Sequence, residues 1–226
     1  MIILAIDTST DYLSLAVLKA DKVIAKFHKK ADMRHSILLV PTIDKLLKKA
    51  KIRIKEIDCF AISVGPGSFT GLRIGVTVVK GLAFALNKPV IAVPTLDVIA
   101  MNARKFKGII CPVLDARKNK VYACLYRSDG SIIKRLSKYL LLPLDDLLRK
   151  LEKYDKVLFL GDAISPPGGE NHFPSGRGGK VLKDYHPKAE IVARLAAEDF
   201  KKKKFIKAQD LEPMYIYSKE CDVTGR

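Results

Sequence analysis

Histidine is scarce in this chain of 226 residues, and its spacing offers no set of metal ligands. The four histidines are His28, His35, His172 and His186. None of them forms an HxxxH pair, the spacing that places two metal ligands on one face of a helix. The Gly-x-Ser-x-Gly turn of serine hydrolases is also missing. We therefore predict no metal site, no catalytic residue and no peptidase activity.

Cysteine is equally sparse. The four cysteines are Cys59, Cys111, Cys124 and Cys221, and no two of them form the CxxC pair of a redox or metal motif. The first three lie in apolar runs typical of strands, so we expect buried free thiols there.

Long apolar runs are absent too. No stretch of about eighteen uncharged apolar residues is present, and residues 1–7 lack the basic flank of a signal peptide. We expect a cytoplasmic protein without membrane contact. Because 48% of the residues are hydrophobic, the chain is able to bury a sizeable core in one or two lobes.

Acidic residues are few compared with basic ones. The chain has 24 Asp and Glu against 41 Lys and Arg, a net charge of +17. This excess favours an acidic partner such as a nucleic acid or an anionic protein surface. A lysine-rich solvated surface, as in thermophile proteins, explains it equally well.

A glycine-rich block lies between a predicted strand and a predicted helix. The apolar run 59–64 indicates the strand, 65–67 the turn, and 69–86 a helix capped by Ser68 or Thr70. Such a helix start offers backbone N–H groups to an anion. However, Thr70 replaces a glycine that both the Walker loop and the dinucleotide fingerprint require, and no Lys-Ser or Lys-Thr follows. The block therefore contains no complete phosphate motif.

Two glycines of this helix favour a packing role. Gly71 and Gly75 lie one helical turn apart and leave a stripe without side chains. Such a stripe allows a second helix to approach closely. We therefore interpret the helix as a docking element for a partner.

The chain contains a weak internal repeat. Residues 6–18 and 114–126 align without a gap at an offset of 108 residues. Each copy is a strand that ends in aspartate, a short polar turn and an alternating strand. A third strand follows in both copies, at 22–27 and 131–136. The repeat predicts two lobes of the same design.

The remaining elements are predicted as helices at 36–50, 95–103, 144–151 and 189–200 and strands at 90–93 and 157–160. Their alternation after an antiparallel hairpin indicates mixed sheets covered by helices. We expect one lobe over residues 1–104 and a second over 105–226, which includes the last helix. The proline and glycine residues of 165–179 predict a mobile surface loop, in which His172 is solvated.

Five segments together resemble the bacterial TsaB (YeaZ) family. They read LAIDTST at 4–10, GPGSFTGLRIG at 65–75, VPTL at 93–96, DARKNKVY at 115–122 and LEPMY at 211–215. The resemblance spans nearly the whole chain and departs from the family at 165–179, where a helix is expected. It implies an α/β chain with the actin-like ATPase (ASKHA) fold, two duplicated ribonuclease-H-like lobes, in agreement with the repeat.

The resemblance also implies a function. Members of the family serve in making threonylcarbamoyladenosine beside the anticodon of tRNAs, as non-catalytic partners of the paralogous transferase TsaD. An ATPase, TsaE, joins them, so tRNA is reached through the complex. The transferases carry a metal-binding histidine pair after the strand equivalent to 90–93, but residues 94–100 contain no histidine. This chain is thus expected to be a scaffold or activator subunit.

The family places its partner interface on two helices of the first lobe. The residues expected there are Ser36, Leu39, Ile43, Gly71, Arg73, Ile74, Gly75, Thr77 and Val78. Because the two proteins are paralogues, we expect a homodimer through the same face when TsaD is absent.

Nucleotide binding and direct tRNA binding are the alternatives. No cofactor is required, but weak ATP or ADP contacts would involve Asp7, Thr8, Ser9, Gly65, Gly67 and Ser68. Otherwise Asp7 caps the hairpin turn as an Asx residue. A stand-alone ATPase or kinase needs the nucleotide site, whereas a direct tRNA binder would use the basic runs 45–55 and 201–204. The second run lies at a helix C-terminus, where cations are favourable anyway.

Overall fold

The computed structural model describes residues 1–164, 180–181 and 185–216. The predicted loop 165–179 with His172, and also Cys221, lie outside these residues. The chain divides into two compact units. Unit 1 comprises Met1–Val98 and His186–Met214, and unit 2 comprises Ile99–Tyr185 and the residues from Tyr215 onward.

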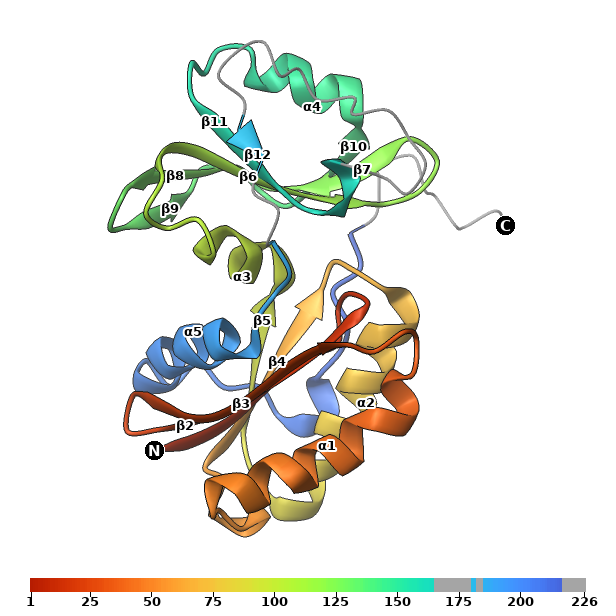
Figure 1. Cartoon of the computed structure of the whole chain (residues 1–226), viewed down its shortest axis with the longest axis vertical. Coiled ribbons are helices and arrows are strands. Elements are labelled where there is room, and N and C mark those ends of the chain that lie inside the picture. Colours follow the sequence, from red (N-terminus) through yellow and green to blue (C-terminus); the bar gives the residue numbers. More distant parts are fainter. Residues whose placement is uncertain (165–179, 182–184, 217–226) are drawn as a thin grey trace. The chain divides into compact units, whose positions relative to one another are not determined.

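Unit 1 is built on a five-stranded mixed sheet (Figure 1). Its strands are β1 (Ile2–Asp7), β2 (Tyr12–Lys19), β3 (Lys22–Lys30), β4 (Cys59–Gly65) and β5 (Val90–Pro94), in the order β3-β2-β1-β4-β5. The first three strands form an antiparallel meander, while β4 and β5 run parallel to β1. Nearly every residue of β1 and β4 is buried, because helices cover both faces of the sheet.

The two faces of this sheet carry side chains of different size. One face presents large residues such as Leu4, Ile6 and Phe60 to α1 (His35–Ala50) and α2 (Phe69–Leu86). The other face presents smaller residues, among them Ala5 and Ala61, to a single helix, α5 (Ala189–Lys201). Strand alternation therefore decides which helix packs on which face. Figure 1 shows α1 and α2 on one side of the sheet and α5 on the other.

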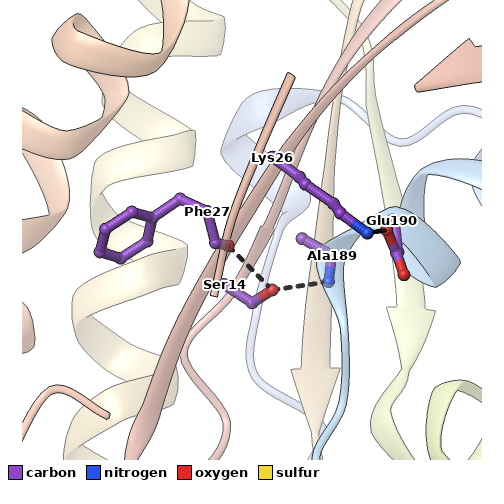
Figure 2. A network of polar contacts seen from close by, with 5 residues as sticks. All are labelled: Ser14, Lys26, Phe27, Ala189 and Glu190. Carbon is purple, nitrogen blue, oxygen red and sulfur yellow. Dashed lines mark hydrogen bonds and ion pairs between the residues drawn. The ribbon is translucent and has the colours of Figure 1, made fainter. Parts of the chain in front are cut away.

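Helix α5 is fixed to the meander by polar contacts at its first turn (Figure 2). The backbone N–H of Ala189 donates to Ser14 Oγ at 2.9 Å, and the Ser14 hydroxyl donates to the carbonyl oxygen of Phe27 at 3.3 Å. Lys26 Nζ lies 2.6 Å from a carboxylate oxygen of Glu190. Ser14 thus satisfies one of the N–H groups that a helix start leaves unpaired.

The predicted lobe boundaries 1–104 and 105–226 are wrong for the C-terminal part of the chain. Helix α5 packs on the first sheet, and Ile206 after it forms an antiparallel bridge with Val90 of β5. The amphipathic pattern of residues 189–200 predicts a helix correctly, but it carries no information about which sheet receives the apolar face. The change of unit near residue 98 falls within α3 (Thr95–Met101).

Unit 2 contains a second mixed sheet. Its strands are β6 (Lys107–Asp115), β7 (Lys120–Ala123), β8 (Tyr126–Asp129), β9 (Ile133–Arg135), β10 (Leu140–Pro143), β11 (Val157–Leu160) and β12 (Lys180–Val181). The main order is β10-β7-β6-β11-β12, with β8 paired to β6 and β9 paired to β8. Helix α4 (Leu144–Leu151) buries Leu147 and Leu151 in the core of this unit. Single 3₁₀ turns occur at Ile54–Glu56, Asp162–Ile164 and Ala208–Asp210.

The internal repeat is confirmed, with one difference between its copies. Strand β6 ends at Asp115 as β1 ends at Asp7, and an antiparallel strand follows each of them. In the second copy that strand is broken into β7 and β8, which both pair with β6. The third strand is broken in the same way, because β10 pairs with β7 and β9 with β8. Strands β8 and β9 consequently extend the sheet from the first half of β6, and we call this strand pair the β8–β9 ribbon.

The predicted elements agree closely with the observed ones. Helices expected at 69–86 and 144–151 match α2 and α4, and the strand expected at 157–160 matches β11. The strand expected at 22–27 continues to Lys30 as β3, and the other predicted helices and strands differ by one or two residues at an end. Helix α1 continues through Pro41. The predicted cap is also confirmed, since Ser68 Oγ accepts the N–H of Gly71 at 3.2 Å.

We predict that Ser14→Ala destabilises unit 1 by about 1–3 kcal/mol, because it leaves the buried N–H of Ala189 without its acceptor. Urea denaturation followed by circular dichroism measures this change. Ser36→Ala is the control, since Ser36 is exposed on α1 and its loss should change stability by less than about 0.5 kcal/mol. Equal stabilities of the two variants would contradict the anchoring role of Ser14.

Candidate functional site

The turn between β1 and β2 packs directly on the first two turns of α2. A Cβ atom at Gly67 would lie 2.2 Å from the carbonyl oxygen of Ser9, and one at Gly71 would lie 2.1 Å from that of Thr8. At Gly75 a Cβ would lie 2.3 Å from Thr8 Oγ1. No real Cβ tolerates these distances, so all three glycines are required by contact within the chain.

Hydrogen bonds reinforce this contact. The backbone N–H of Ser68 donates to the carbonyl oxygen of Ser9 at 2.7 Å. Thr8 Oγ1 donates to the carbonyl oxygen of Gly71 at 2.7 Å, while the N–H of Gly71 is bound by its own cap, Ser68. Two donors at the start of α2 are therefore used within the protein rather than offered to an anion.

The prediction that the glycine stripe docks a partner helix is therefore wrong, because the stripe packs against the same chain. Gly71 and Gly75 are buried against Thr8 of the same unit, and they are not open to a helix of another protein. Leu39 and Ile43 of α1 are likewise buried in the core of unit 1. Helical periodicity identifies the flat face correctly, but a strand end and a partner helix both fit such a face.

Asp7 is fully buried at the end of β1. Its Oδ1 accepts the N–H of Ser9 at 3.0 Å and the Ser9 hydroxyl at 3.0 Å, the geometry of an Asx turn. Burial raises the pKa of Asp7 to about 6, and the hydroxyl of Ser63 with the N–H and hydroxyl of Ser9 partly offset that shift. The Asp7 carboxylate thus stabilises the turn that follows β1.

The other residues expected at a nucleotide are also engaged within unit 1. Thr8 and Ser9 are buried. The N–H of Gly65 donates to Thr95 Oγ1 at 3.1 Å, and the N–H of Met214 donates to the carbonyl oxygen of Val64 at 2.7 Å. The glycine turn is therefore covered by the chain itself, with only Ser68 exposed.

Unit 2 repeats this closure at the equivalent strand end. The N–H of Asp115 donates to Asp162 Oδ1 at 2.8 Å. A Cβ on Gly161 would lie 1.7 Å from the carbonyl oxygen of Val113, so the turn after β11 lies tightly on β6. Gly161 and Asp162 therefore contact the neighbouring strand β6 of the same unit.

The outer faces of α1 and α2 are different, because they leave large apolar side chains in solvent. Ile37 and Val40 on α1 are 70% and 55% exposed, and Phe84 on α2 is 77% exposed. Phe69 is also exposed, with the Arg73 guanidinium 3.8 Å above its ring centre. The two helices contact each other on the same side of the sheet. We call this surface the α1–α2 face.

The predicted interface residues divide between the α1–α2 face and the core. Ser36, Arg73 and Thr77 are exposed on it, and Ile74 and Val78 are half-buried. The sequence reading missed Ile37, Val40 and Phe84. Helical periodicity could have identified these three residues, since each lies on the side of its helix opposite to the buried residues.

Comparison with known proteins identifies the family. The family model TsaD, tRNA N6-adenosine threonylcarbamoyltransferase, matches residues 24–216. The tRNA threonylcarbamoyladenosine biosynthesis protein TsaB of Bacillus subtilis is 39% identical over 166 residues, which cover 73% of this chain and 72% of that protein. The chain belongs to the TsaB (YeaZ) family.

A solved TsaB-family structure confirms the fold. YeaZ from Pseudomonas aeruginosa has a TM-score of 0.83 and 27% identity, covering 95% of this chain and 99% of that one. The expected actin-like (ASKHA) α/β fold is thereby confirmed. The tRNA N6-adenosine threonylcarbamoyltransferase of Thermosipho melanesiensis is 34% identical over 108 residues, 41% of this chain and 33% of that protein. The TsaB family and the transferases are therefore related in sequence.

The described cysteines are buried, and the candidate metal ligands are dispersed in the described part of the chain. Within residues 1–164, 180–181 and 185–216, no group of three His, Cys, Asp or Glu is placed to hold a metal. The predicted buried thiols are confirmed for Cys59, Cys111 and Cys124. Burial raises the pKa of Cys59 to about 12, and it also raises the pKa of Cys111. Such thiols are poor nucleophiles at neutral pH.

One helix of the described residues, α2, is long and apolar enough to cross a membrane by length and composition. One third of its residues are buried, and its inner face packs on β4 in the core of unit 1. The apolar outer side belongs to the α1–α2 face. The apolar character of α2 therefore has an explanation in packing and in this exposed surface.

We predict that Gly71→Ala prevents native folding or destabilises unit 1 by more than about 3 kcal/mol, because the new methyl group meets the backbone of Thr8. Thermal unfolding measures this. Gly81→Ala in the same helix is the matched control: a Cβ there has no neighbour within 4 Å, so this variant should gain about 0.5–1 kcal/mol. A stable, folded Gly71→Ala variant would refute the contact.

We predict a pH-dependent effect of Asp7→Asn. The carboxyl has a pKa of about 6 when folded and about 4 when unfolded, so the native state binds the proton more tightly. Wild-type stability from Asp7 is therefore greatest at low pH and falls as pH rises through 6. The advantage of Asn over Asp should grow by about 2 kcal/mol from pH 4.5 to pH 7.5. Urea titrations at both pH values test this, and a constant difference would argue against it.

Proposed function

We propose that this chain is a non-catalytic subunit that binds a TsaD-type transferase and supports the formation of threonylcarbamoyladenosine in tRNA. The observation that carries the proposal is the α1–α2 face, where apolar side chains of two adjacent helices stay exposed. Among the residues that the structure describes, five of the ten exposed large hydrophobic side chains lie on α1, on α2 or just before α1. They are Met33, Ile37, Val40, Phe69 and Phe84. A concentrated apolar surface of this kind favours a protein interface.

The relation to the transferases supports the choice of partner. The TsaD family model matches most of this chain, so the two proteins share a common design. Two copies of one design pair readily through equivalent surfaces around a twofold or pseudo-twofold axis. In the interface we place Ser36, Arg73, Ile74, Thr77 and Val78 from the sequence prediction. The interface also includes the exposed apolar residues of the α1–α2 face, namely Ile37, Val40, Phe69 and Phe84.

The closed strand end in unit 1 supports a non-catalytic role. Asp7, the residue that an actin-fold ATPase would use, is buried and bound by its own turn. Gly67 and Gly71 hold that turn against α2, where a phosphate would need room. The geometry therefore favours neither a stand-alone ATPase or kinase nor a required nucleotide cofactor.

The remaining expectations belong to the same proposal. A TsaE-like ATPase joins the complex, and tRNA is modified by the complex as a whole. The protein acts in the cytoplasm. In the absence of the transferase, a second copy of this chain occupies the α1–α2 face as a homodimer.

We predict that Phe84→Glu and Ile37→Glu each weaken binding to the TsaD-type transferase of the same organism by about thirty-fold, which corresponds to about 2 kcal/mol. A buried, unpaired carboxylate opposes association, whereas both positions tolerate it in the free protein because they are exposed. Surface plasmon resonance with immobilised transferase measures the affinity, and circular dichroism verifies the fold.

Ile24→Glu is the matched control, since Ile24 is an exposed apolar residue on β3 and belongs to neither α1 nor α2. It should leave transferase binding unchanged. The Phe84→Glu variant should also be monomeric in sedimentation, because the homodimer uses the same face. Undiminished binding by both helix variants, or ATP turnover by the purified chain that is lost in Asp7→Ala, would contradict the proposal.

A further inference from the structure

The β8–β9 ribbon of unit 2 collects basic side chains. Two basic residues face each other directly across its strands, because Arg127 pairs with Lys134 in the antiparallel register. Like charges at directly opposite positions destabilise a strand pair. Both side chains are exposed. The ribbon therefore retains an arrangement that folding alone disfavours, which is a feature of functional sites.

The segment before β6 adds to this charge. Lys107 lies opposite Asp129, and the Ser128 hydroxyl donates to the carbonyl oxygen of Arg104 at 2.8 Å, so residues 104–107 lie along the ribbon. Together, 104–107 and 126–139 contain seven basic residues against one acidic residue. The basic residues are Arg104, Lys105, Lys107, Arg127, Lys134, Arg135 and Lys138, and the acidic one is Asp129.

The single carboxylate is already engaged in the ribbon's turn. Asp129 Oδ1 accepts the backbone N–H groups of Ser131 and Ile132, each at 2.8 Å. These bonds are the main reason why the pKa of Asp129 lies below its usual range. Across the part of the chain that the structure covers, Arg127, Lys134 and Lys138 form no ion pair with a carboxylate.

The two basic runs singled out by sequence are different. In the first run, Lys48 lies 2.7 Å from Asp44 and Arg53 lies 3.0 Å from Glu56. In the second, Lys201 is within 3.7 Å of both Asp21 and Glu198, and Lys204 is 3.5 Å from Asp199. Their charge is thus partly neutralised by neighbours, and the ribbon is the stronger anionic-partner surface.

The ribbon also carries apolar side chains beside its charges. Ile132 and Leu136 are 59% and 45% exposed, and they alternate with the neighbouring positions so that they share a side of the ribbon with Lys134. On the other side the Arg135 guanidinium stacks on Tyr139, 4.7 Å from the ring centre. Basic side chains that contact phosphates, with apolar groups beside them for riboses and bases, are typical of RNA-binding surfaces.

We propose that the β8–β9 ribbon of unit 2 binds the phosphate backbone of tRNA. The proposal rests on the proposed function, because the TsaB relatives are named for tRNA modification and tRNA is then the polyanion that this subunit meets. A phosphate between Arg127 and Lys134 turns their repulsion into two favourable contacts. The contact recognises the backbone and not the base sequence.

The test is the salt dependence of tRNA binding. The binding constant K is measured by fluorescence anisotropy with a labelled, unmodified tRNA transcript. KCl is varied from about 50 to about 200 mM, because affinity that depends on phosphate contacts changes strongly over this range. The full-length chain and its complex with the transferase are both used. The ribbon variant is Arg127→Gln, Lys134→Gln, Lys138→Gln. The matched control, Lys45→Gln, Lys49→Gln, Lys55→Gln, removes the same charge from α1 and the turn after it.

We predict that the ribbon variant lowers the slope of log K against log salt by about 2, because about 0.7–0.9 is lost for each phosphate contact. The control variant should keep the wild-type slope. A second variant separates function from folding: Lys134→Glu replaces a like-charge pair by an opposite one, so its melting temperature should rise while its tRNA affinity falls about ten-fold. A purely structural role would move both quantities together.

Three outcomes would overturn the proposal. They are a ribbon variant with the wild-type affinity and slope, a wild-type chain and complex that both fail to bind tRNA at the lowest salt, and a ribbon variant that loses the transferase instead of tRNA. The last would make the ribbon a protein interface. Phe84→Glu keeps this test distinct from the proposed function, because it should lose the transferase while the isolated chain retains the wild-type salt slope.

Discussion

The contact between the β1–β2 turn and the start of α2 is the constraint on which the site in this protein depends. Three glycines, Gly67, Gly71 and Gly75, allow the carbonyl oxygens of Thr8 and Ser9 to lie where side chains would otherwise be. Once the turn lies there, Asp7 is buried and the N–H groups at the helix start have partners within the chain. The same contact fixes the rotation of α2 about its axis, so that Phe84 faces solvent. One packing contact thus accounts both for the burial of Asp7 and for the exposure of Phe84.

The fold reuses one design with two different endings. Both units place an aspartate at the end of a central strand and a glycine turn at the end of the parallel neighbour. In unit 1 the meander strands are continuous, whereas in unit 2 each of the last two is broken into a pair. The break leaves β8 and β9 paired with the first half of β6, and this strand pair carries basic side chains at its exposed positions. The exposed apolar side chains of α1 and α2 thus lie in unit 1, whereas the basic ribbon lies in unit 2.

The local surroundings of each basic residue explain the electrostatics of this protein better than its net charge does. The chain has a net charge of +17, but its basic residues differ in their neighbours. Some lysines pair with a nearby carboxylate, as Lys26 does with Glu190, whereas the basic residues of the ribbon have one acidic neighbour, Asp129, which is bound in the turn. Exposed ion pairs add little stability, but they lower the local potential that attracts a polyanion. The distribution, which no composition reveals, decides where an anionic partner gains the most.

Local sequence determined the elements of this protein, whereas tertiary structure decided how their faces are used. Periodicity placed α2 and α4 at their observed bounds, and the Ser68 cap follows from local chemistry, because both depend on residues within a few positions. The repeat from Asp7 to Asp115 was visible for the same reason.

Contacts distant in sequence lay beyond such reasoning. Helix α5 joins the first sheet across 175 residues through Ser14 and Ala189, and Gly71 meets Thr8 across 63. An apolar or flat helix face in the sequence predicts only that this face packs against a surface of matching shape. A strand end in the same chain and a helix of another protein meet that need equally well, and only the three-dimensional packing distinguishes them.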